Sequence, residues 1–335
     1  MGAEPAHFPD AAPFDGVNEF PDWLDPMVVK ELRQGLRASW FLGPFIGIQM
    51  ACLGLIWIEY RAARPGGAAL ASEEIGHQVF WGLVFLTLGG VLPLRSLAGL
   101  SGEMAGDGPR LVLIAGISRW RIVMGKWLTQ MALAGLTVIS LLPYAIVRYF
   151  FGGVEFLPNA LTLACALGLA GAMNALLLGA SGYADYWMRT VIALTGALYV
   201  GIPMVGLAAM VGDVSTADEL FRPGVASLAA LWGVLGVGLA LTYYCFCGLQ
   251  LARSRLRAGM RPWEVPPSRP ILVLFFLSPL YFGLISFATC GLGFPLVAAG
   301  LVWWVWSLDP ADFPVRSEMH FIHPKPTVAP KTYRF

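Results

Sequence analysis

Long uninterrupted runs of apolar residues limit what this chain can fold into. A helix rises about 1.5 Å per residue, so roughly 20 apolar residues cross the hydrocarbon core of a bilayer, which is about 30 Å thick. Most of the runs are near or above that length. They lie at Trp40–Ile58, Gln78–Leu94, Ile122–Val147, Ala160–Ala180, Thr190–Val211, Ser227–Leu251, Ile271–Cys290 and Leu292–Leu308.

The composition also indicates a membrane-embedded chain. Hydrophobic residues make up 57% of the sequence against 13% charged residues, and the mean hydropathy is +0.67. A soluble domain carries about a quarter charged residues. We therefore expect an all-α polytopic membrane protein with a six-helix core. The last two runs, joined by the tight turn Gly291–Pro295, form an extra C-terminal hydrophobic hairpin that spans or re-enters, so that the total is 6–8 spans.

The distribution of lysine and arginine predicts the orientation of the spans. With the N-terminus inside, the outer segments keep few of the 22 basic residues, and the cytosolic segments hold the rest. The outer ones are Arg61, Arg64, Arg148 and Arg222. The positive-inside rule therefore predicts that both termini are cytosolic. Residues 1–22 lack the pattern of a cleavable signal peptide, so we expect the first span to direct insertion.

A short amphipathic helix is predicted before the first span. Asp25 followed by Pro26 is typical of a helix start. Val28, Leu32 and Leu36 then form one apolar stripe, and most of the remaining side chains are charged or polar: Lys30, Glu31, Arg33, Gln34 and Arg37. This pattern predicts an elbow helix that lies at the membrane surface. The alternative is a cytosolic extension of the first span.

The polar joint between the second and third runs is the candidate functional segment. It begins with the acidic, Gly-rich stretch around Glu103, passes through the apolar residues Leu111–Ile114, and ends with Arg119 and Arg121 at the start of the next helix. A cytosolic segment of this kind can receive a push from a partner protein and pass it into two helices. The coupling candidates are Glu103, Leu111, Leu113, Arg119, Arg121 and Lys126.

These features divide the chain into consecutive parts. We expect an irregular cytosolic N-terminus (1–24), the elbow helix (25–39), the six-span core (40–251) with its coupling segment (101–121), a basic cytosolic loop (252–270), the hairpin (271–308) and a cytosolic tail (309–335). Small residues at helical spacing predict close helix packing within the core. They are Gly43/Gly47, Ala164/Gly168/Ala172 and Ala193/Ala197/Gly201.

The spans hold almost nothing that could carry chemistry. Glu59 and Arg95 lie at span ends, where their head groups can reach water, and Gln49 and Asn174 are expected to hydrogen-bond between helices. There is no intramembrane set of carboxylates for ion-driven transport and no nucleophile with a nearby base. We therefore expect no catalytic residue in this chain. The pair His320 and His323 lies in a Pro-rich tail, and no metal site is expected.

The chain also lacks a nucleotide site. Gly125-Lys126 resembles the end of a phosphate-binding loop, but Trp120 stands where that motif needs its first glycine and Trp127 follows the lysine. No cofactor is expected in this chain, and its net charge of +1 does not favour nucleic acid as a partner. An apolar bundle of this kind takes its energy from another protein or needs none.

Several segments resemble the type-2 ABC exporter permease family. Residues 25–34 (DPMVVKELRQ) are similar to that family's entry segment, and the joint resembles its cytosolic loop between the second and third spans, from Glu103 through Ser118-Arg-Trp-Arg to Gly125-Lys126. Leu142-Pro143 and residues 149–154 (YFFGGV) are also similar, so the resemblance covers about residues 25–251. Two features depart from the family: Met104 stands where an arginine is frequent, and Gly106-Asp107-Gly108-Pro109 replaces the usual Gly-Thr.

The resemblance implies the membrane subunit of an ATP-driven exporter in a bacterial cytoplasmic membrane. Such a subunit works as a dimer with a second permease subunit, and a separate ABC ATPase subunit binds the ATP and magnesium. The final hairpin lies outside the common six-span core. A non-transporting membrane scaffold on the same fold stays open as an alternative, and the missing catalytic site disfavours a membrane-embedded enzyme.

The orientation yields the first prediction. Single cysteines in the joint (101–121) or in the basic loop (253–269), in a background without the native five, react with an impermeant thiol reagent only from the cytosolic side. Cysteines within 62–76 react only from the outside. Labelling of position 105 from the outside contradicts the orientation.

Overall fold

The computed structural model describes residues 26–62, 69–100, 118–151, 156–183, 185–201, 225–256, 268–289 and 291–308. All regular secondary structure within these residues is helical. Six of the described helices are long and apolar enough to cross a membrane, which confirms the expected polytopic helical architecture at that level. They are Ser39–Arg61, Gly76–Ala98, Arg119–Phe150, Asn159–Ser181, Leu231–Arg255 and Arg269–Ala288.

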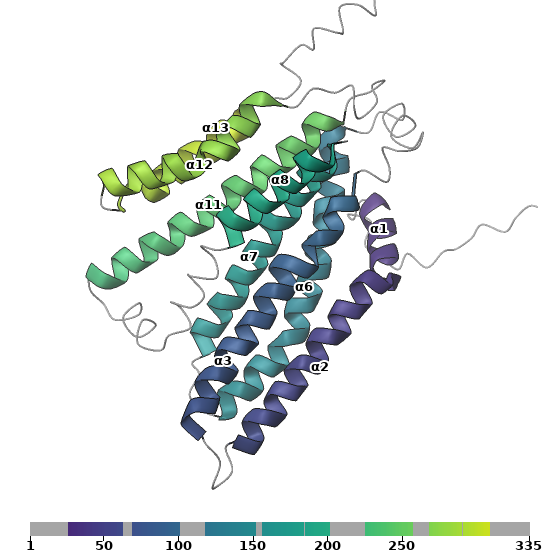
Figure 1. The fold of residues 1–335 in the computed structure, drawn as a ribbon, viewed down its shortest axis with the longest axis vertical. Coiled ribbons are helices and arrows are strands. Elements are labelled where there is room, and N and C mark those ends of the chain that lie inside the picture. The colour runs from purple at the N-terminus through teal and green to yellow at the C-terminus, as the bar shows by residue number, and fades with distance from the viewer. Residues whose placement is uncertain are drawn as a thin grey trace, which may run out of the picture.

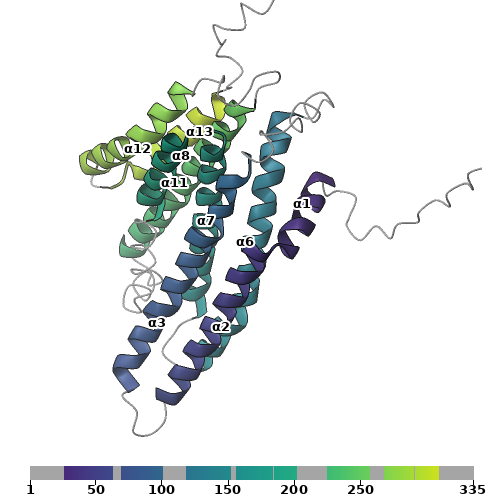
Figure 2. The same ribbon diagram turned by 45° about the vertical axis from the view of Figure 1, so that its right-hand side comes forward.

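The helices form one bundle with a short helix at one end (Figures 1 and 2). In chain order they are α1 (Pro26–Arg37), α2 (Ser39–Ala62), α3 (Ala69–Phe85), the π-helix η1 (Leu86–Val91), the 3-10 helix η2 (Pro93–Ala98), α6 (Arg119–Phe151), α7 (Phe156–Ser181), α8 (Tyr186–Gly196), the π-helix η3 (Ala197–Gly201), α11 (Val225–Arg255), α12 (Arg269–Ala288) and α13 (Phe294–Ser307). Both views place α12 and α13 on the side of the bundle away from α1 and α2. We call the end of the bundle where α1 lies the α1 end.

Helix α7 is the most buried of the six long helices, and its closest neighbour is α11. The two backbones approach so closely that a Cβ atom on Gly248 would lie 2.3 Å from the carbonyl carbon of Ala175. A Cβ atom on Gly179 would likewise lie 2.6 Å from the carbonyl oxygen of Gly248. Helices in lipid associate through such close packing because the surrounding tails are as apolar as the side chains.

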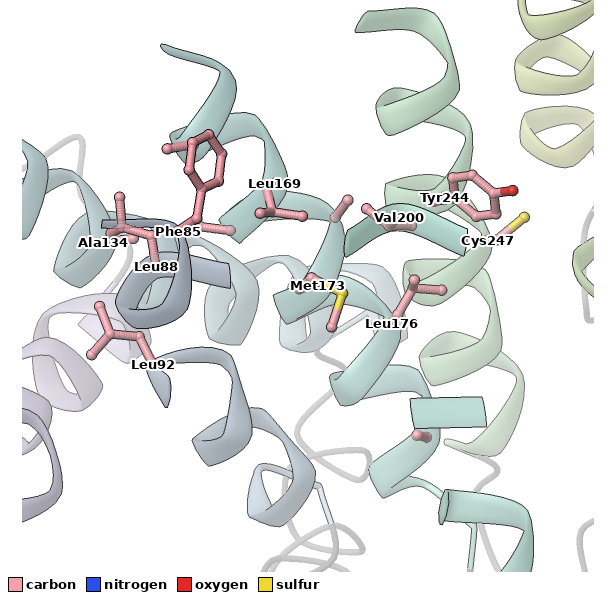
Figure 3. Close-up of a cluster of buried hydrophobic side chains, with 14 of the residues drawn as sticks. Phe85, Leu88, Leu92, Ala134, Leu169, Met173, Leu176, Val200, Tyr244 and Cys247 are labelled. Atoms are coloured by element: carbon pink, nitrogen blue, oxygen red, sulfur yellow. The ribbon is translucent and has the colours of Figure 1, made fainter. Parts of the chain in front are cut away.

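The main hydrophobic core extends to both sides of α7. In the close-up, Leu169 and Met173 of α7 lie between Leu88 of η1 and Val200 of η3 (Figure 3). Beyond Val200 the cluster continues to α11 through Tyr244. Helix α7 therefore joins the second span to α8, η3 and α11.

The second span is not a regular α-helix. Its π-helical segment closes with a bond from the Leu92 N–H to the Thr87 carbonyl at 3.0 Å, and Pro93 then begins the 3-10 helix η2. Proline lacks an N–H donor, so the pattern of backbone hydrogen bonds changes at this point. The changed path brings Ser96 to α7, where its hydroxyl donates to Asn174 Oδ1 at 2.9 Å. The expected interhelical role of Asn174 is confirmed.

Polar contacts tie α2 to α6, and one of them corrects a prediction. The side chain of Gln49 donates to Ser140, as expected for a mid-span polar group. Glu59, which was expected to reach water, instead pairs with Arg148 at 3.0 Å, and both side chains are largely buried. Arg148, predicted in an outer loop, lies inside α6 above the ring of Phe80. The prediction was wrong because an arginine one turn inside a helix end can pair within the bundle and need not extend to water.

The predicted small-residue faces are only partly correct. Gly168 lies against Leu241, and Ala172 is buried, as predicted for α7. A Cβ atom added at Gly43, Gly47 or Gly201 would meet no other atom within 4 Å, so these three positions make no close contact. Spacing alone does not indicate which neighbour a helix face meets, and the close approach uses Ala175, Gly179 and Gly248 instead.

The C-terminal hairpin packs on α11. Trp232 of α11 donates its indole N–H to the Leu292 carbonyl at 2.9 Å, at the turn between α12 and α13. Farther along, Phe246 of α11 contacts Trp306 near the end of α13. Helix α13 therefore runs parallel to α11 and ends near the α1 end. Helix α12 has the length of a span, whereas the 14 residues of α13 are fewer than a span needs.

The predicted fifth run, Thr190–Val211, is helical through α8 and η3 up to Gly201, and its remainder lies outside the described residues. The six helices of span length found among the described residues include α12, and of this run only the part up to Gly201 was open to that comparison. The predicted N-terminal segment, basic loop and tail also lie largely outside the described residues.

The contact between α7 and α11 gives the second prediction. Gly248→Val forces side-chain atoms into the backbone of α7, and overpacking of this kind costs about 1–3 kcal/mol or more. We expect a lower thermal unfolding midpoint and a smaller monodisperse fraction of the purified chain. Gly43→Val is the matched control, because that position is open, and it should leave both properties unchanged. Equal stability of the two variants contradicts the packing.

Candidate functional site

The α1 end of the bundle holds the described residues of the predicted coupling site. Helix α6 begins there, and Ser118 caps it by accepting a hydrogen bond from the Arg121 N–H at 3.3 Å. Serine is a favoured N-cap residue. Arg119 and Arg121 lie in the first turn, and Arg121 is exposed. A helix N-terminus favours acidic side chains, so these two arginines do not stabilise the helix. These arginines are placed instead to contact a group outside the helix or to help orient the chain in the membrane.

Helix α1 packs against α6 near its start. Lys126 Nζ lies 2.7 Å from Glu31 Oε1, and both side chains are mostly buried. One turn farther along α1, Gly35 lies directly against Leu133 of α6. Leu32 packs against the main core. The elbow is therefore attached to the bundle by an ion pair and by close packing, in addition to any contact with the membrane surface.

The predicted elbow and coupling residues thus separate into two groups. Glu31 and Lys126 face each other and are withdrawn from the surface, and Leu32 is half-buried. Among the described members of the two predicted sets, Lys30, Arg33 and Arg121 are exposed and Arg119 is half-buried. Val28 is buried as the apolar stripe predicted, but Leu36 is 37% exposed. Lys126 holds the elbow to α6, which the sequence did not indicate.

A second hydrophobic cluster, separate from the main core, lies at the start of α6. We call it the end cluster, and it joins the second span, α6, α7 and α11. Its buried members are Leu100, Ile122, Val123, Ala175, Leu178, Leu249, Ala252 and Leu256. Trp120 and Trp127 pack against it. The cluster includes Leu100, the last described residue before the coupling segment, and Ile122 and Val123, which directly follow the segment.

Hydrogen bonds reinforce the end cluster. The Leu100 N–H donates to Ser181 Oγ at 3.2 Å, and Trp127 Nε1–H donates to the Gly171 carbonyl at 3.0 Å. Both flanks of residues 101–117 are therefore bound to α7. Glu103, Leu111 and Leu113 lie outside the described residues.

The turn between α7 and α8 is held by two arginines. Buried Arg255 at the end of α11 donates from Nε to the Gly182 carbonyl at 2.9 Å, and its guanidinium lies 4.5 Å from the ring centre of Tyr183. Arg189 donates to the Tyr183 carbonyl. Asp185 then caps α8 by accepting from the Trp187 N–H at 3.1 Å. Burial raises the pKa of Tyr183 to about 12, so its hydroxyl is neutral at physiological pH.

Tyr183 and Arg255 are structural residues of this end that the sequence pattern did not indicate. Arg255 was assigned to the basic loop, but α11 continues to it. A basic residue in the last turn of a helix is a signal for a stabilising contact with free carbonyl groups. Nothing in the sequence indicates that those carbonyls belong to α7.

The contacts among the described residues of this end are hydrogen bonds, ion pairs, ring contacts and apolar packing. Among the described residues, no three His, Cys, Asp or Glu side chains come together as a metal site. Comparison with protein-family models, with curated proteins and with solved structures finds no match. The fold itself defines the class: the chain is an integral membrane protein of the polytopic helical type.

The contact between α1 and α6 gives the third prediction. A double-mutant cycle of Glu31→Gln and Lys126→Met should yield a coupling free energy of about 0.5–3 kcal/mol in thermal or denaturant unfolding of the purified chain, as expected for directly paired residues. The matched control is a cycle of Glu31→Gln with Arg61→Gln, at the opposite end of the bundle, which should show no coupling. A value near zero for the first cycle contradicts the attachment of the elbow.

Proposed function

We propose that this chain is the transmembrane permease subunit of an ATP-driven ABC exporter, in which a separate ATPase subunit hydrolyses ATP and drives substrate export. The resemblance of residues 25–251 to the type-2 exporter permeases motivates the proposal. ATP and magnesium belong to the partner subunit in this scheme. The proposal includes a second permease subunit, location in a bacterial cytoplasmic membrane, and cytosolic termini.

The end cluster is the observation that supports coupling best. A partner can move the spans only through a segment that is firmly fixed to them. Leu100 and Ile122, on the two flanks of the coupling segment, are both buried in the end cluster with α7 and α11. A force on residues 101–117 would therefore pass into the second span, α6, α7 and α11 together, and would not be lost in a free loop. Close-packed side chains transmit such displacements because they leave little free volume.

The elbow supplies a second route into the same helix. Its ion pair to Lys126 lies about one and a half turns beyond the end of the coupling segment on α6. Arg119 and Arg121 belong to the coupling segment itself and lie in the first turn of α6. In our proposal these arginines set the docking orientation of the ATPase, because rim charges at an interface control register more than affinity. Leu111–Ile114 would enter an apolar groove of the ATPase.

The fourth prediction tests coupling in the assembled complex. An ABC ATPase encoded beside this gene should co-purify with the chain, and a crosslinker at position 113 should capture it. Glu103→Ala and Arg119→Ala should lower permease-stimulated ATP hydrolysis by up to about fivefold, because one exposed ion pair contributes at most about 1 kcal/mol. Membrane insertion and yield should stay normal.

Arg61→Ala is the control, since Arg61 lies at the opposite end of the bundle, over the ring of Trp57. It should leave ATP hydrolysis unchanged. If the ATPase co-purifies but neither charge matters and no crosslink forms, coupling uses a different surface. If no ATPase binds the chain under any condition, the scaffold function replaces the exporter.

A further inference from the structure

The ends of α6, α11 and α13 meet in an aromatic and basic corner that the exporter proposal does not use. Trp306 of α13 lies between Trp120 of α6 and Phe246 of α11, with ring centres 6.0 Å and 5.1 Å away and edge-to-face packing in both pairs. The guanidinium of Arg253 on α11 lies 6.0 Å from the ring centre of Trp120. We call Trp120, Arg253 and Trp306 the Trp–Arg corner.

The corner is accessible although its rings are fixed. Trp306 is 56% exposed while its ring contacts two other helices, and its neighbours Trp303 and Trp304 are 74% and 53% exposed. Tryptophan favours the boundary between lipid tails and head groups, because its indole has an apolar body and one N–H donor. Three exposed tryptophans within four residues are therefore suited to lie at the level of lipid head groups.

The charged side chains described next to the rings of the corner are arginines. Helices α6, α11 and α13 contain no Asp or Glu along their whole lengths. Their ends contribute Arg119 and Arg121 beside Trp120, and Arg253 over its ring. Arginine at such a boundary favours phosphate, because its planar group of N–H donors matches two phosphate oxygens.

We propose that the Trp–Arg corner binds the head group of an anionic phospholipid. Arg253 contacts the lipid phosphate, and the rings of Trp120 and Trp306 pack against the glycerol backbone. One acyl chain lies along the exposed apolar face of α6 at Leu128, which is 45% exposed. The bound lipid joins the α12–α13 hairpin to the six-span core. The inference goes beyond the exporter proposal and does not depend on an ATPase.

The fifth prediction tests this binding on the full-length purified chain. The probe is phosphatidylglycerol, titrated into the chain in phosphatidylcholine nanodiscs, and the readouts are the thermal unfolding midpoint and the lipid retained in native mass spectrometry. Phosphatidylglycerol should raise the midpoint. Arg253→Gln and Trp306→Ala should each increase the lipid concentration required by about fivefold, which corresponds to about 1 kcal/mol for one basic residue near an anionic surface. Arg253→Lys and Trp306→Phe should keep most of the response.

The opposite end of the bundle supplies a matched control. Arg61 lies over the ring of exposed Trp57 at 4.3 Å, so Arg61→Gln and Trp57→Ala remove the same chemical pair from a single helix. These variants should keep the full response. The proposal is overturned if phosphatidylcholine alone stabilises as strongly, or if the control variants lose as much as the corner variants. It is also overturned if the corner variants keep their lipid response and lose only an ATPase, because the corner would then be a protein-docking surface.

Discussion

The close approach of α7 and α11 is the contact on which the rest of the bundle depends. Gly248 of α11 lies against the backbone of Ala175, and Gly179 of α7 lies against the backbone of Gly248. Lipid tails offer no hydrophobic drive for helix association, so the gain comes from many short-range contacts that only small residues allow. With α11 fixed in this way, α7 presents its remaining faces to the second span, α6 and α8, and the two hydrophobic clusters form around it.

Charge pairing holds the other side of the bundle. An unpaired charge is costly at membrane depth, and a matched partner reduces that cost. Helix α6 carries one such pair near each end, with Glu31 through Lys126 and with Glu59 through Arg148. These pairs connect α6 to α1 and α2. The glycines of α2 at positions 43 and 47 make no close contact. Helix α1 is consequently part of the bundle, and its ion pair ties it to the helix that follows residues 101–117.

The helix starts at the candidate site could be predicted from the sequence, whereas the contacts between helices could not. The spacing of Val28 and Leu32 predicted an elbow, and α1 covers that range. The basic-aromatic entry at Ser118–Arg121 predicted a helix start, and Ser118 caps it. The partner of Lys126 was not predictable, because Glu31 is distant in sequence and both residues are typical of a solvated surface. The end cluster was missed because Leu100, beyond the second span, and Ile122, at the start of the third run, are ordinary apolar residues whose neighbours come from other helices.

By itself the sequence determined the class of the protein and the existence of its apolar helices, because the length of an apolar run and the scarcity of charge are local properties that a bilayer selects directly. It also determined the excess of basic residues around the coupling segment. Only the tertiary structure decided which small residues make close contacts, that Arg148 pairs with Glu59 inside the bundle, and that α13 returns along α11 to bring Trp306 to Trp120. These outcomes depend on which helix faces meet, and that choice follows from the packing of all the helices together.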